Sequence, residues 1–180
     1  NAEILFSGIP LEGSCKDIDA RWTKKNNETY YGYKNHIKVD TRSKFIGMYA
    51  VTDASVHDSQ VLGDLLEESD AGQPLYADSA YFGENQEATI DEYQMINKVH
   101  EKGFKDHPLD EKQKESNRIK SKIRARVEHV FGFMEQSMHR LNVRSIGLDR
   151  SFTIAGLYNL AYNLCRYEQV LRLNLLPVKN

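Results

Sequence analysis

The feature that most constrains the fold is a stripe of apolar residues, spaced by threes and fours, between Ile119 and Leu141. This spacing places the apolar residues on one face of an α-helix and predicts a helix of about six turns that begins near Asn117. A last helix is predicted over residues 152–173, where apolar residues occur on more than one face of the helical period, so we expect it to pack deeply. The side chains expected inside it are Leu157, Leu160, Ala161 and Leu164.

Before these helices, apolar and polar residues alternate with a period of two. The apolar positions of residues 29–39 are Tyr31, Tyr33, Ile37 and Val39, and the polar positions between them are Lys34, His36 and Lys38. This pattern predicts a β-strand with one buried face and one basic face. Residues 41–44 suit a turn and residues 45–52 form a second, more apolar run, so the two segments predict an antiparallel hairpin.

The segment after the hairpin predicts alternating helices and strands. A helix is expected from about Ser55 to Glu68, followed by a central strand (residues 74–78), a short helix (84–93) and a further strand (95–99). Together with the hairpin, the order is β-β-α-β-α-β, which indicates an α/β fold. Residues 1–26 lack a sustained period and predict an extended arm, and the charged residues 101–116 predict a solvated connection.

Length and composition limit the classes of protein. The 180 residues suffice for one hydrophobic core, which we assign to residues 27–173, between the arm (1–26) and a tail (174–180). No apolar run approaches the roughly 20 residues of a membrane helix, and no secretory signal opens the chain. Cys15 and Cys165 suit neither a disulfide framework nor a zinc site, so the cytoplasm is expected. A net charge of −2 argues against a wholly basic nucleic-acid binder, although it hides local patches.

One carboxylate lies at a position that favours ligand binding. Asp78 ends the predicted central strand and precedes a loop of small residues. In open α/β sheets, ligands collect at the carboxyl ends of strands, so Asp78 is a candidate metal ligand. A cap on a neighbouring turn explains a strand-end aspartate equally simply, and the residue alone does not decide between the two roles.

The predicted long helix begins with a dense basic run. Seven Lys or Arg residues and a single acid, Glu115, lie between Lys112 and Arg126 inclusive. Further along, Arg124 and Glu128 are four residues apart and therefore share a helix face. A basic helix that passes a carboxylate indicates an approaching phosphate. An i,i+4 ion pair on a solvated helix face is the alternative.

Several motifs together resemble a known family. They are residues 19–25, 31–38, 51–58, 76–81 and 126–132. In this order and spacing they resemble the bacterial insertion-sequence transposases of the DDE superfamily, and the similarity extends from about Lys16 to Leu171. The resemblance implies a ribonuclease-H-like core, a mixed sheet flanked by helices, in which two Asp and one Glu bind two Mg²⁺ or Mn²⁺ ions.

By motif, the resemblance assigns Asp78 as the second catalytic and metal-binding Asp and Glu128 as the Glu. The implied reaction is hydrolysis at a transposon end followed by attack of the freed 3′ hydroxyl on target DNA. Double-stranded DNA is the implied partner, bound by a homo-oligomer in the bacterial cytoplasm, associated with the nucleoid. The residues expected to contact DNA are Lys34, His36, Lys120, Arg124 and Arg126.

The sequence departs from the family pattern at two places. Residues 1–12 resemble the insertion that follows the strand of the first Asp, so this Asp is expected upstream of the chain. Glu135 stands where the family commonly has a Lys. The Glu135 carboxylate in place of a Lys is expected to weaken DNA binding locally. Because only two of the three carboxylates are expected in this chain, we expect little or no strand transfer by the chain alone. Two alternatives remain open: a non-catalytic DNA-binding remnant of a transposase, and a structure-specific metal nuclease on the same fold.

Overall fold

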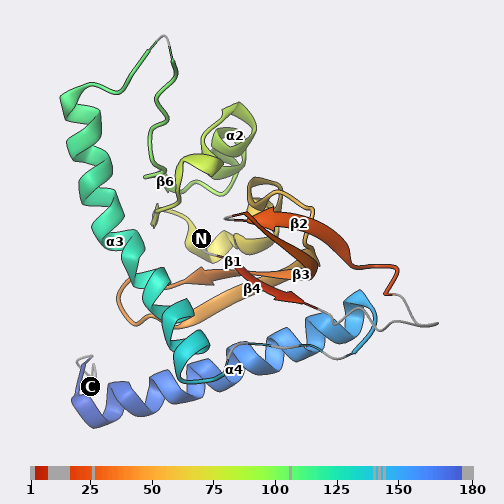
Figure 1. The fold of residues 1–180 in the computed structure, drawn as a ribbon. Coiled ribbons are helices and arrows are strands. Elements are labelled where there is room, and N and C mark those ends of the chain that lie inside the picture. The colour runs from red at the N-terminus through yellow and green to blue at the C-terminus, as the bar shows by residue number, and fades with distance from the viewer. Residues whose placement is uncertain are drawn as a thin grey trace.

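The structure is a computed structural model that describes residues 3–7, 17–25, 27–105, 107–139, 141, 143 and 145–175. It contains a four-stranded antiparallel sheet, two long helices, and a smaller region built from short helices and a two-stranded sheet (Figure 1). The strands are β1 (Glu3–Ser7), β2 (Arg21–Lys25), β3 (Glu28–Val39), β4 (Ile46–Asp53), β5 (Pro74–Leu75) and β6 (Ile96–Asn97). The α-helices are α1 (Leu62–Leu65), α2 (Glu84–Glu92), α3 (Glu111–Gln136) and α4 (Leu148–Leu173). The mixed α/β class is as predicted.

The long strand β3 organises the main sheet. It pairs with β4 in the predicted antiparallel hairpin, from the pair Tyr33–Asp53 to the pair Val39–Ile46. β1 and β2 also pair antiparallel with β3, so the prediction of an arm without strands is wrong for these two segments. The sequence did not predict these strands, because residues 1–26 show no regular alternation of apolar and polar residues and main-chain pairing requires none. Residues 17–20 are described and are not part of a strand, and residues 1–2, 8–16 and 26 of the predicted arm, including Cys15, lie outside the described residues.

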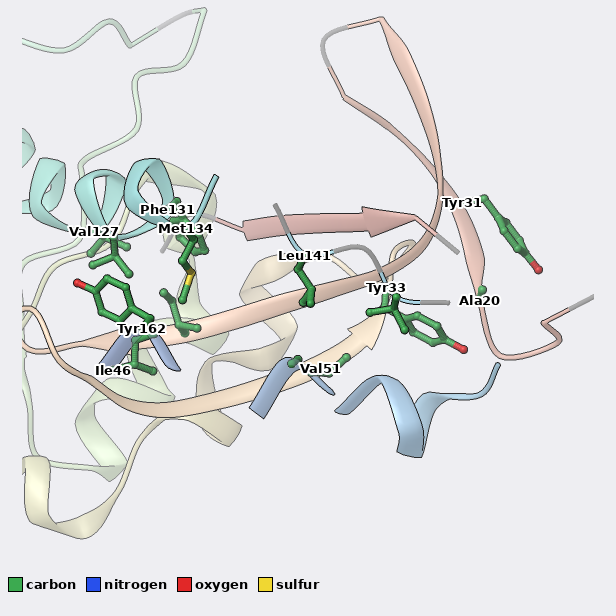
Figure 2. Close-up of a cluster of buried hydrophobic side chains, with 14 residues drawn as sticks. Ala20, Tyr31, Tyr33, Ile46, Val51, Val127, Phe131, Met134, Leu141 and Tyr162 are labelled. Carbon is green, nitrogen blue, oxygen red and sulfur yellow. The ribbon is translucent and has the colours of Figure 1, made fainter. Parts of the chain in front are cut away.

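The main core lies between the β3–β4 hairpin and the two long helices (Figure 2). α3 contributes Val127, Val130, Phe131 and Met134 from its second half. In its first half, Ile119 is 53% exposed, so only part of the predicted stripe is buried. α3 begins at Glu111 rather than near Asn117, because Asp110 and Gln113 form a capping box that satisfies the first backbone N–H groups.

α4 packs against the sheet with a face that the apolar pattern does not predict. Its buried residues are Ser151, Ala155, Asn159, Tyr162 and Val170. Leu157, Leu160 and Leu164, expected inside, are 62%, 53% and 61% exposed. The Asn159 side chain exchanges hydrogen bonds of 2.8 and 3.2 Å with the Asn35 side chain, and these polar contacts fix the inward face. Neither α4 nor any other helix of the described residues has both the length and the apolarity of a membrane span.

A second core lies in the smaller region. It is formed by Leu62, Leu66, Ala77, Tyr81, Ile90 and Val99. The predicted order of helices and strands is confirmed here, although the helix after the hairpin is a 3₁₀ turn, Asp58–Val61, followed by the short α1. β5 and β6 are parallel and form their own two-stranded sheet, so the prediction that β5 is a central strand is wrong for the described residues.

Candidate active site

Asp78 lies just beyond β5, beside the end of β6. Main-chain hydrogen bonds extend the parallel pairing past the two strands, with the His100 N–H donating to the Ala77 carbonyl at 3.0 Å. One oxygen of the Asp78 carboxylate accepts the Ala80 N–H at 2.9 Å and caps the 3₁₀ turn Ser79–Tyr81. The capping role considered from the sequence is therefore real, and it uses one of the two carboxylate oxygens.

The other oxygen of Asp78 points to α3. One terminal nitrogen of the Arg124 guanidinium forms an ion pair with Asp78 Oδ2 at 3.1 Å, and the other donates a hydrogen bond to Glu128 Oε1 at 3.3 Å. The side chains of Arg124, Asp78 and Glu128 are 25%, 35% and 57% exposed. The structure thus brings Asp78 and Glu128, fifty positions apart in sequence, to the two ends of one guanidinium, where solvent reaches both acids. We call these three residues the Arg124 site.

Two further residues border the Arg124 site. The Lys120 ammonium, one helical turn before Arg124, donates to the Val99 carbonyl at 2.9 Å and lies 3.5 Å from Glu101. His100 follows β6, and its ring lies 3.3 Å from the Ser121 hydroxyl. Burial and then the charges of Arg124 and Lys120 hold the pKa of His100 below its ordinary value. Sequence reasoning missed His100; its position at the end of a strand parallel to that of Asp78 is the signal that could have found it.

A groove lies along the first half of α3, and Lys120, which borders the Arg124 site, is one of its lining residues. The volume of the groove is about 650 Å³. The lining residues are Tyr76, Lys98, Glu111, Lys112, Glu115, Ser116, Ile119, Lys120 and Ile123. The lining combines three ammonium groups with two carboxylates and apolar surface, so the excess of positive charge along the groove is small. On the helix surface outside the groove, Arg126 is exposed and donates to the Thr41 carbonyl.

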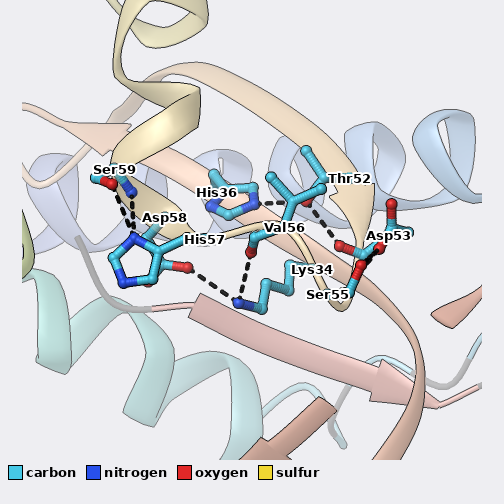
Figure 3. A network of polar contacts seen from close by, with 9 residues as sticks. All are labelled: Lys34, His36, Thr52, Asp53, Ser55, Val56, His57, Asp58 and Ser59. Atoms are coloured by element: carbon cyan, nitrogen blue, oxygen red, sulfur yellow. Dashed lines mark hydrogen bonds and ion pairs between the residues drawn. The ribbon is translucent and has the colours of Figure 1, made fainter. Parts of the chain in front are cut away.

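Lys34 and His36 do not lie on an exposed face. Lys34 is 7% exposed, and its ammonium contacts the Val56 carbonyl at 2.9 Å and the Asp58 carboxylate at 3.2 Å. His36 is 1% exposed, and its ring lies 2.9 Å from the Thr52 hydroxyl (Figure 3). The segment after β4 folds over this face, so the predicted exposed basic face is wrong. The predicted DNA contacts of Lys34 and His36 require exposed side chains, and these two side chains are buried.

A second acidic region lies at the start of α4. Asp17 is buried, and its carboxylate accepts hydrogen bonds from the Tyr33 hydroxyl at 2.8 Å and from the backbone N–H groups of Gly147 and Asp19. Burial on its own would raise the pKa of Asp17, but these hydrogen bonds outweigh burial and lower it. Asp17 therefore anchors the start of α4 to β3 of the sheet.

The donor set of the Arg124 site limits how a metal ion would bind. Nowhere in the described part of the chain do three or more His, Cys, Asp or Glu residues gather as a metal cluster. Asp78 and Glu128 supply two hard carboxylate groups. Mg²⁺ commonly binds through one or two carboxylates together with water and substrate phosphates. The two acids fit that mode and do not form an all-protein cage.

Comparisons with known proteins cover most of the chain. Residues 7–164 match a family described as "Transposase DDE domain". The chain is also 31% identical over 151 residues to the "Transposase for insertion sequence element IS1106" of Neisseria meningitidis serogroup B, an alignment that covers 84% of this chain and 52% of that protein. The chain thus spans about half the length of this relative. No solved structure matches it significantly.

Proposed function

The chain belongs to the transposase DDE domain family, and on that premise we propose that it is the catalytic part of a bacterial DNA transposase. The proposed reaction is cleavage of phosphodiester bonds at transposon ends and transfer of the freed strand to target DNA. The observation that carries this proposal is the approach of Asp78 and Glu128 to the same guanidinium.

In this proposal Asp78 and Glu128 are the residues that would hold divalent ions. Mg²⁺ or Mn²⁺, when bound, supplies Lewis-acid activation of the attacking oxygen and neutralises the charge on the leaving one. The Asp78 carboxylate is held by the Ala80 N–H, which fixes its orientation at the end of β5. The part of α3 that carries Glu128 is held in place because its neighbours Val127 and Val130 are buried in the main core.

DNA contacts are proposed for the first half of α3. Lys120 and Arg124 lie at the groove and at the Arg124 site, and Arg126 is exposed beyond them. Phosphate contacts to such cations provide affinity without reading the sequence. The finer fold, a ribonuclease-H-like core, belongs to this proposal, as do a homo-oligomer on paired transposon ends and a nucleoid-associated place in the cytoplasm.

Cleavage of cognate end DNA tests the proposal. Asp78→Asn and Glu128→Gln, introduced into the transposase with all of its catalytic acids, should each lower Mg²⁺- or Mn²⁺-dependent cleavage by about 10³-fold, because several kcal/mol of charge stabilisation are lost. Asp91→Asn is the control, since Asp91 is an exposed acid of α2 outside the Arg124 site. Cleavage that survives Asp78→Asn contradicts the assignment.

A second candidate function is DNA binding without catalysis. The observation that favours it is that Arg124 already neutralises part of the charge of both acids. A remnant of this kind would bind DNA with an affinity that falls steeply with salt. Its affinity would be unchanged by Mg²⁺ and by Glu128→Gln, whereas a catalytic domain would respond to both.

A further inference from the structure

Arg124 contacts its two acids with only some of its hydrogen-bond donors. An arginine that pairs with one carboxylate through two parallel hydrogen bonds gains both strength and fixed geometry. In Arg124, one terminal nitrogen instead lies 3.1 Å from Asp78 and the other lies 3.3 Å from Glu128. Its Nε is buried and has no hydrogen-bond partner among the described residues. Both acids are also in contact with solvent, so the pairing is weaker than a buried ion pair.

The guanidinium occupies the place where a cation is needed. Two carboxylates that share a site repel one another, and a positive charge between them relieves that repulsion. We propose that Arg124 is an internal counter-ion, which holds Asp78 and Glu128 together in the free protein and is displaced when a divalent cation binds them. The released guanidinium then contacts a DNA phosphate. This inference rests on the proposed function, because it takes Asp78 and Glu128 as the metal-binding acids.

The surroundings of Arg124 support such an exchange. The side chain is 25% exposed, so it can turn toward solvent or DNA without crossing the core. A guanidinium matches the geometry of phosphate as well as that of carboxylate. Because the divalent cation must displace Arg124, the affinity measured for the cation is reduced by the cost of that displacement.

Mn²⁺ binding by the 180-residue chain, followed by electron paramagnetic resonance, tests the exchange. Arg124→Gln should bind Mn²⁺ at least about fivefold more tightly than the unmodified chain, which is the lower end of typical coupling between two ligands. Arg126→Gln removes the same charge from the same helix without touching the acids and should leave the affinity roughly unchanged. Arg124→Lys, which offers a single ammonium in place of two donor nitrogens, should lie between the unmodified chain and Arg124→Gln.

Two results overturn the exchange. One is an affinity for Mn²⁺ that Arg124→Gln leaves unchanged or lowers. The other is an equal gain in Arg126→Gln, which would make the effect one of net charge. Circular dichroism melting of each variant verifies that it is folded, and Arg124→Lys repeats the test if Arg124→Gln does not fold.

A further variant separates this failure from failure of the proposed function. If Asp78→Asn abolishes Mn²⁺ binding while Arg124→Gln leaves it unchanged, the metal-binding acids stand and the exchange is wrong. If Asp78→Asn has no effect on Mn²⁺ binding in either the unmodified chain or Arg124→Gln, the ion binds elsewhere and both proposals fail.

A second readout is DNA binding. With Mn²⁺ present, Arg124→Gln should reduce the salt dependence of DNA affinity by about one phosphate contact, and without Mn²⁺ it should not. Equal salt dependence under both conditions contradicts the release of Arg124 to DNA.

Discussion

Two places in the described structure have one cation between two acids, and they differ in how many hydrogen bonds and ion pairs the acids receive. Lys38, on β3, lies 2.8 Å from Glu67 and 2.7 Å from Asp70. Those two acids also form a capping box, in which each side chain accepts the other's backbone N–H. We call these three residues the Lys38 site. In the Arg124 site the distances from the guanidinium to Asp78 and Glu128 are 3.1 and 3.3 Å, and the Arg124 Nε has no hydrogen-bond partner in the described part of the chain.

The comparison separates a structural ion pair from an exchangeable one. In the Lys38 site the acids have short contacts to the cation and to backbone N–H groups, so replacing the cation would break several hydrogen bonds together. In the Arg124 site Asp78 accepts a backbone N–H, from Ala80, whereas Glu128 accepts none from the residues that the structure describes and is 57% exposed. A chemical role is therefore expected at the Arg124 site and a structural role at the Lys38 site.

The largest expected effect on stability is at the Lys38 site. Lys38→Met should lower the free energy of unfolding by about 2–3 kcal/mol, because it leaves Asp70, whose side chain is 14% exposed, without its counter-ion. Urea denaturation measures the change, and Lys98→Met, at an exposed lysine of the smaller region, is the control. A loss no larger than that of the control would remove the distinction between the two sites.

The pH dependence of stability sharpens the same distinction. Burial alone would lower the pKa of the Lys38 ammonium, but the hydrogen bonds and charges of Asp70 and Glu67 outweigh burial and raise it. A raised pKa in the folded state stabilises the protein fully below the unfolded value, and this stabilisation is lost as the pH rises through the folded value. The free energy of unfolding of the unmodified chain should therefore fall more steeply above about pH 10.5 than that of Lys38→Met. Parallel curves for the two proteins above that pH would show that the Lys38 ammonium is not stabilised by its acids.

The smallest expected change is at the Arg124 site. Arg124→Gln should alter the free energy of unfolding by no more than about 1 kcal/mol, because half-exposed ion pairs contribute little. The same urea titration measures it beside Lys38→Met. A loss of 2 kcal/mol or more would mean that Arg124 is as structural as Lys38, and the proposed exchange would then be too costly.

Local periodicity predicted the parts of the fold whose contacts are close in sequence. The alternation around Tyr33 predicted the β3–β4 hairpin, and the order of elements from the hairpin to β6 followed from short apolar runs. The inward face of α4 could not be predicted in this way, because it is set by the pairing of Asn159 with Asn35, 124 positions apart. The sequence pattern predicted that the leucines of α4 are buried because they are apolar. In the structure, the polar contacts of α4 with the sheet determine which face is buried.

The candidate site shows the same division. A strand-end position singled out Asp78, and the resemblance to a family singled out Glu128, but neither reveals that Arg124 contacts both acids. Lys34 was misjudged because the alternation of β3 gives no information about the segment that covers its polar side. Contacts between elements distant in sequence decide exposure, and a single sequence does not record them.

The most direct test of the central claim is a titration of the isotopically labelled chain with Mn²⁺, followed by the broadening of backbone amide signals in NMR spectra. If Asp78 and Glu128 are the metal-binding acids, the signals of residues 77–80 and 125–129 should broaden first and together, and Asp78→Asn should abolish the effect at both segments. Broadening that begins at the Lys38 site or around Asp17, and is unchanged by Asp78→Asn, would contradict the claim.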